Sequence, residues 1–133
     1  GKKLQEIIDQ VGNDAFLKME EDCVRGLECD QTVVATGGSV VYGKEAMRRL
    51  HENGLVVYIR LPYEEIERRL SNLATRGVTL KKGQTLRNLY DERIPLYEAE
   101  ADYTFEPEEG DVQETVLDLA QRLSARMEAD NGR

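Results

Sequence analysis

The sequence predicts a single α/β domain built on a parallel sheet, and two apolar runs carry this prediction. Residues 33–36 (Val-Val-Ala-Thr) run into the pair Gly37-Gly38, and residues 55–61 (Leu-Val-Val-Tyr-Ile-Arg-Leu) end at Pro62. Short apolar runs bounded by glycine or proline are typical of buried strands. Helical periodicity lies before, between and after the two runs, which favours right-handed crossovers between parallel strands.

Helices are expected wherever apolar residues recur three or four positions apart. Gly54 and Pro62 stand where a helix C-cap and a helix start belong, and Pro95 should bend the helix that contains it. A third, brief strand is expected over 103–106. The expected helices cover residues 1–10, 15–25, 44–53, 63–75, 85–101 and 112–128, the last with Val116, Leu117, Ala120 and Leu123 on its buried face.

The composition is that of an ordinary globular protein, with 133 residues, 40% hydrophobic and 33% charged. No apolar run approaches the ~20 residues of a membrane span, and the first residues given do not have the basic-then-apolar pattern expected of a leader. A net charge of -8 disfavours binding to nucleic acid or to an anionic membrane. We therefore expect a cytoplasmic monomer whose partners are small molecules.

Cysteine and histidine are too few for a metal centre. Cys23 and Cys29 are accompanied by one histidine, His51, so no metal ligand is expected and the thiols are interpreted as reduced and incidental.

The glycine pair is the first candidate site. Glycines at the carboxyl end of a strand let backbone N–H groups approach a ligand, and ligands bind at that end of open α/β sheets. The alternative is that Gly37 and Gly38 form an ordinary loop.

Further motifs follow the glycine pair in a recognisable order. They are Val33-Val34-Ala35-Thr36-Gly37-Gly38-Ser39, then Val56-Val57-Tyr58-Ile59, Arg76, Arg93-Ile94-Pro95-Leu96-Tyr97 and Ala101-Asp102. With these motifs the chain resembles the shikimate kinases, small P-loop kinases of the nucleoside-monophosphate-kinase type, over almost its whole length. The resemblance implies a three-layer α/β/α parallel sheet for the single domain 1–133, with a lid loop at about residues 74–85.

The resemblance also implies roles for individual residues. Gly37 and Gly38 would present N–H groups to the acceptor, and Arg93 would bind the acceptor carboxylate, oriented by Glu20. Arg76 would close over the ATP phosphates. On the residues alone, the favoured interpretation of Arg93 is a helix-surface ion pair with Glu92 or a neighbour, and Arg76 fits a solvated loop arginine.

Several family features are absent from the 133 residues. There is no Gly-x-x-Gly-x-Gly-Lys-Ser/Thr loop and no Asp-x-Asp pair, so we expect the first strands to lie before Gly1 and assign no catalytic residue. The family arginine of Phe-Arg-x-x-Glu is Leu17 here, and Lys18 lies about 100° further round the helix. An arginine of the adenine loop has no counterpart in residues 106–110.

The resulting hypothesis is ATP- and Mg²⁺-dependent phosphorylation of shikimate to shikimate 3-phosphate in aromatic amino-acid biosynthesis. The 133-residue chain by itself is expected to be inactive. Two alternatives remain: a related kinase with a different acceptor, as Leu17 permits, and a non-catalytic binding module.

Overall fold

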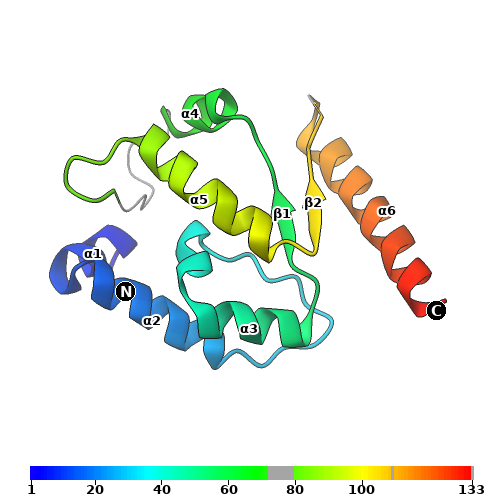
Figure 1. The fold of residues 1–133 in the computed structure, drawn as a ribbon, viewed down its shortest axis with the longest axis horizontal. Coiled ribbons are helices and arrows are strands. Elements are labelled where there is room, and N and C mark those ends of the chain that lie inside the picture. The colour runs from blue at the N-terminus through cyan, green and yellow to red at the C-terminus, as the bar shows by residue number, and fades with distance from the viewer. Residues whose placement is uncertain (72–79, 109, 133) are drawn as a thin grey trace.

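The structure is a computed structural model that describes residues 1–71, 80–108 and 110–132 (Figure 1). None of the described helices is long and apolar enough to cross a membrane. In chain order the elements are α1 (Leu4–Val11), α2 (Asn13–Arg25), a 3₁₀ helix (Gly38–Tyr42), α3 (Lys44–Asn53), β1 (Val57–Ile59), α4 (Tyr63–Ser71), α5 (Leu86–Glu100), β2 (Tyr103–Phe105) and α6 (Val112–Asn131).

Strands β1 and β2 form a parallel pair in which Tyr58 is opposite Thr104. Backbone hydrogen bonds extend the pairing at both ends, from Asp102 N to Val56 O (2.9 Å) and from Arg60 N to Phe105 O (2.8 Å). Parallel strands need a long crossover, and α4 and α5 lie on the connection between β1 and β2. Both strands lie within the ranges that the sequence predicted, but β1 is shorter than residues 55–61.

The strand predicted over residues 33–36 is not formed in this structure. The described part of the chain contains one sheet, of β1 and β2, and Val33 is 96% exposed. A strand exists only through hydrogen bonds to a neighbour, and an apolar run does not reveal whether that neighbour is present. The segment therefore reaches the glycine pair without pairing to a strand.

The helices follow the predicted pattern closely. α1, α2, α3 and α5 begin and end within three residues of the predicted positions, and α5 continues through Pro95. Gly54 is the C-cap of α3, as the sequence predicted, and its backbone is extended (φ -173°). The predicted end of the helix at residue 75 lies outside the described residues.

The core of the molecule lies beneath the glycine pair. Val40, Ala46 and Met47 are buried together, with further apolar side chains packed against them from α2, α3 and the start of β1. The Glu21 carboxylate accepts a hydrogen bond from the Glu45 backbone N (3.1 Å) and so caps α3 from α2. α2, the 3₁₀ helix and α3 therefore form one packed unit that supports the glycine pair.

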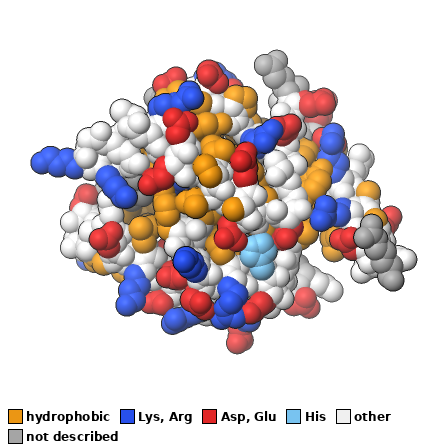
Figure 2. Space-filling view, in the orientation of Figure 1, with side chains coloured by type: hydrophobic (Ala, Val, Ile, Leu, Met, Phe, Trp, Pro, Cys, Tyr) orange, Lys and Arg blue, Asp and Glu red, His pale blue; other side chains and the backbone are white. Residues whose placement is uncertain are grey.

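The predicted burial of the last helix is wrong. α6 has no buried residue, and Val116 and Leu117 are 59% and 62% exposed. The helix lies beside β2 (Figure 1), where the Arg122 guanidinium is 5.9 Å from the centre of the Phe105 ring. Periodicity identified an apolar stripe, but a stripe is buried only where another element faces it. Apolar and charged side chains are mixed over this part of the molecule in Figure 2.

Candidate functional site

The glycine pair lies between α2 and α5. A Cβ on Gly37 would lie 2.6 Å from Glu20 Oε1, and a Cβ on Gly38 would lie 2.9 Å from Arg93 Nη1 and 2.7 Å from Tyr97 Oη. These separations are shorter than any real Cβ contact, so a larger residue at either position would displace the ends of the Glu20, Arg93 or Tyr97 side chains. The structure thus brings together the pair Gly37-Gly38, Glu20 and Arg93, which come from three segments that lie far apart in the sequence.

The Ser39 hydroxyl donates a short hydrogen bond to the Glu20 carboxylate. This bond joins α2 to the first turn of the 3₁₀ helix, directly after the glycine pair. Glu20 was expected to orient Arg93, and that role stays a prediction. The structure shows in addition that Glu20 is hydrogen-bonded directly to the loop, through Ser39.

The Arg93 side chain is half-buried, and one of its N–H groups is left without a hydrogen-bond partner among the described residues. Its guanidinium carbon is 5.5 Å from the centre of the Tyr42 ring, a cation–π distance. The Nε atom is buried and has no hydrogen-bond partner among the described residues. A buried N–H without a partner is costly, and a ligand carboxylate is one group that would satisfy it. The side chain is therefore suited to bind an anionic ligand beside Gly38.

Tyr97 contacts the same glycine from the next turn of α5. Its hydroxyl donates to the Gly38 carbonyl oxygen at 2.8 Å, and its ring centre is 5.2 Å from that of Tyr58 on β1. Burial raises the pKa of the Tyr97 phenol, an effect that the nearby Arg93 cation opposes. The phenol therefore remains a protonated donor at neutral pH.

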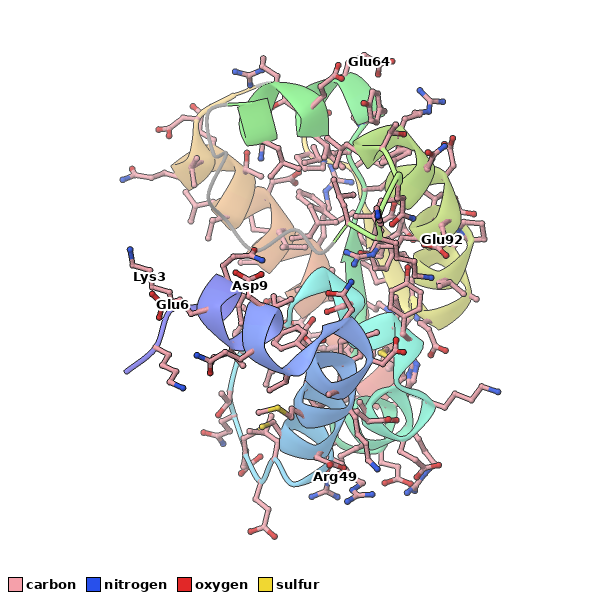
Figure 3. The ribbon with its side chains drawn as sticks, turned by 90° about the vertical axis from the view of Figure 1, so that its left-hand side faces the viewer. Lys3, Glu6, Asp9, Arg49, Glu64 and Glu92 are labelled. Carbon is pink, nitrogen blue, oxygen red and sulfur yellow. The ribbon has the colours of Figure 1, made fainter. Side chains whose placement is uncertain are left out.

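Glu92, which precedes Arg93 in the sequence, projects from α5 (Figure 3) and forms hydrogen bonds with other residues. Its carboxylate accepts hydrogen bonds from the Tyr42 hydroxyl (2.9 Å) and from Gln84 Nε2 (3.2 Å). The Tyr42 hydrogen bond is the main reason why the pKa of Glu92 lies below its ordinary value. The alternative of an Arg93–Glu92 surface ion pair is thus not the arrangement seen in the described residues.

An open cavity of about 350 Å³ lies between α2, the 3₁₀ helix and the start of α3. Leu17, Lys18, Glu20 and Ser39 are among the residues that line it. Leu17 therefore contributes an apolar side chain to this cavity, and it stands at the sequence position where the family pattern has an arginine. Lys18 also reaches this cavity, so a cation is present at its border.

Some predicted features fall outside the described residues or gain no support from them. Arg76 and most of the predicted lid loop lie within residues 72–79, which the structure does not describe. Among the described residues no group of three or more His, Cys, Asp or Glu side chains is placed to hold a metal ion. Cys23 and Cys29 are exposed free thiols.

Tyr42, Tyr97 and Ser39 are contacts that sequence reasoning missed. Tyr97 was quoted in the motif of residues 93–97 without a role of its own, although its position four residues after Arg93 places both side chains on one face. That spacing is a signal that could have identified Tyr97. Nothing in the sequence links Tyr42 to Arg93, because their contact depends on how the 3₁₀ helix packs against α5.

Comparison with known proteins identifies one family. A family model described as shikimate kinase matches residues 1–124. The chain is 32% identical to a shikimate kinase of Dictyoglomus turgidum, an alignment that covers 92% of this chain and 76% of the relative. It is 34% identical to one of Paracidovorax citrulli (96% and 71% covered) and 32% identical to one of Vibrio parahaemolyticus (95% and 75% covered).

Proposed function

Because the chain belongs to the shikimate kinase family, we propose that the protein transfers the γ-phosphate of ATP to a hydroxyl group of shikimate. The product is shikimate 3-phosphate, an intermediate of aromatic amino-acid biosynthesis. The single observation that carries this proposal is the convergence of Gly37, Gly38 and Arg93 at one point of the fold. Phosphoryl transfer depends mainly on positioning and electrostatics, and these residues can supply both for the acceptor.

In this proposal the acceptor lies against the exposed glycine pair. The absence of Cβ atoms at Gly37 and Gly38 lets the acceptor approach the backbone closely. The Arg93 guanidinium binds the acceptor carboxylate through two parallel N–H donors. Glu20 holds the loop in place through the Ser39 hydroxyl.

ATP is the phosphate donor, with Mg²⁺ as the ion that the family implies. The described residues do not form a carboxylate set that fits Mg²⁺, so we assign no ligand of the ion to them. Arg76 is proposed, from its place in the sequence pattern, to contact the ATP phosphates from the loop at residues 74–85. Catalytic groups are not assigned within residues 1–133.

The proposal extends to the complete sheet and to the state of the protein. The family implies a three-layer α/β/α parallel sheet, and we propose residues 33–36, which contain the apolar run Val33-Val34-Ala35 and lead directly into the site, as a further strand of it. We also propose a cytoplasmic monomer that binds shikimate and ATP and neither nucleic acid nor membrane, as the net charge of -8 favours.

A second candidate acceptor is a different hydroxy acid. The observation that favours it is Leu17, which contributes an apolar side chain to the cavity. Arg93 would still bind a carboxylate in such an acceptor, while the opposite side of the ligand would be less polar than in shikimate.

The test is a coupled ADP-release assay on the protein expressed from its complete coding sequence, with shikimate and a panel of other hydroxy acids. Arg93→Ala should raise the acceptor KM about tenfold or more, because a charge-assisted hydrogen bond contributes ~1.5–3 kcal/mol, and leave the KM for ATP nearly unchanged. Arg49→Ala is the matched control, since Arg49 also has a buried Nε without a partner among the described residues but lies on α3.

The outcomes separate the candidates. Turnover of shikimate with an Arg93-dependent KM supports the proposal. Turnover of another hydroxy acid alone selects the second candidate. No ATP-dependent turnover with any acceptor contradicts kinase function and leaves the binding-module hypothesis.

A further inference from the structure

We propose that Tyr97 is a positioning residue that fixes the Gly38 peptide in the orientation required for acceptor binding. This inference rests on the proposed function, because it assigns to Tyr97 a part in the same site. Tyr97 does not contact the reacting atoms in this account. It acts through the glycine loop.

The first step is the hydrogen bond itself. The Tyr97 hydroxyl donates to the Gly38 carbonyl oxygen at 2.8 Å. In a trans peptide the carbonyl and the following N–H point in opposite directions. Holding the Gly38 carbonyl toward α5 therefore also directs the Ser39 N–H away from α5, so one side-chain contact sets the rotation of the whole peptide plane.

The second step is the hydrogen bond that fixes the opposite side of the loop. The Ser39 side chain bonds to Glu20 on α2, while Gly38 bonds to Tyr97 on α5. The loop is thus fixed between two helices at consecutive residues. A backbone hydrogen bond from Val40 N to Gly37 O (3.3 Å) also spans this turn, and the Tyr97 bond adds a contact at the Gly38 carbonyl that neither Glu20 nor the backbone bond supplies.

The third step is the rigidity of Tyr97. Its ring packs against the Tyr58 ring of β1 with centres 5.2 Å apart and planes inclined by 36°. It lies one turn after Arg93 on α5, so the same helix carries the loop's hydrogen bond and the guanidinium that lies 2.9 Å from the Cβ position of Gly38. A shift of the loop would therefore change the position of Gly38 relative to the Arg93 guanidinium.

The experiment compares two hydroxyl deletions on the same helix. Tyr97→Phe keeps the ring and its packing on Tyr58 but removes the bond to Gly38. Tyr90→Phe is the matched control, because the Tyr90 hydroxyl donates an equivalent bond, 3.0 Å, to the Leu61 carbonyl oxygen away from the glycine pair. Steady-state kinetics of the protein from its complete coding sequence give KM for shikimate and for ATP separately.

We expect Tyr97→Phe to raise the shikimate KM about three- to tenfold, the range for loss of one neutral hydrogen bond, with less than a twofold change in the ATP KM. Tyr90→Phe should change neither. Equal changes in both KM values, or equal effects of the two variants, would show a merely structural role and overturn the inference.

A ligand-independent measurement separates this inference from the proposed function. Hydrogen exchange of the amides of residues 38–42 should be faster in Tyr97→Phe than in Tyr90→Phe. If the wild-type protein does not turn over shikimate, the proposed function fails, and this exchange difference still decides whether Tyr97 fixes the loop. Identical exchange in the two variants overturns the inference.

Discussion

Arg93 and Tyr97 occupy successive turns of α5 and contact the same glycine from one side. The resemblance to the shikimate kinases implied Gly37, Gly38 and Arg93 as one acceptor site, and the fold places them close together. The residues alone favoured a surface ion pair for Arg93, because the neighbouring Glu92 is visible in the sequence whereas the packing of α5 against the glycine pair is not. The supporting tyrosines were not predicted, because tyrosine at helical spacing is read as part of an apolar stripe.

Leu17→Arg tests the apolar border of the cavity. A guanidinium in this cavity would add a second cation for the acceptor carboxylate, so we predict about tenfold tighter shikimate binding, the size of one charge-assisted hydrogen bond. Isothermal titration calorimetry measures the Kd, and Leu17→Met is the control of similar volume. Unchanged or weaker binding in Leu17→Arg would mean that this side of the cavity does not face the acceptor.

Glu92 should make stability depend on pH. Its pKa in the folded protein is lowered, chiefly by the Tyr42 hydroxyl, so its ionised form stabilises the fold. This contribution is complete above the ordinary carboxyl pKa and is lost as the pH falls through the lower folded-state pKa. Glu92→Gln should therefore reduce the free energy of unfolding at neutral pH, and the difference from wild type should vanish in acid.

Urea unfolding over a series of pH values measures this difference. Glu64→Gln is the control, because Glu64 is an exposed glutamate on α4 and lies away from Glu92 (Figure 3). A wild-type to Glu92→Gln difference that persists unchanged into acid would show that ionisation of Glu92 does not stabilise the fold.

At the scale of elements, helices were predictable and one strand was not. α3 occupies the predicted residues 44–53, since periodicity and flanking glycines are local signals. Residues 33–36 have the composition of a strand but form none, because pairing depends on a distant neighbour. The predicted burial of the apolar face of α6 was wrong for the same reason. A local pattern does not show which element, if any, would cover that face.

The N-terminus of α5 provides a test of how the site-bearing helix is held. Thr85 and Asn88 form a reciprocal capping box, with the Asn88 N to Thr85 Oγ1 and Thr85 N to Asn88 Oδ1 distances both 3.1 Å. Thr85→Ala should lower the free energy of unfolding by about 1 kcal/mol, and Thr85→Ser should largely restore it. Chemical denaturation measures both, and equal stability of Thr85→Ala and wild type would contradict the capping role.

At the scale of the whole molecule, burial is uneven. The buried cluster of Val40, Ala46 and Met47 lies between the 3₁₀ helix and α3, whereas α6 has no buried residue. Figure 2 shows hydrophobic side chains gathered across the middle of the molecule. The site is therefore attached to the best-packed part of the described chain.

The local stability of each helix should follow this uneven distribution of buried residues. Elements with little buried surface open at lower free energy than the core, so we predict that the amides of α6 exchange with solvent faster than those of α3. Hydrogen exchange detected by mass spectrometry measures both helices in one experiment. Protection of α6 equal to that of α3 would show that α6 is covered in solution.

The most direct test of the central claim is the amide spectrum of the ¹⁵N-labelled chain titrated with shikimate. The account predicts that the Gly37 and Gly38 resonances shift with saturation, that α6 resonances do not, and that Arg93→Ala abolishes the shifts. Saturable shifts confined to residues away from the glycine pair, or no shifts at all, would contradict an acceptor site at Gly37, Gly38 and Arg93.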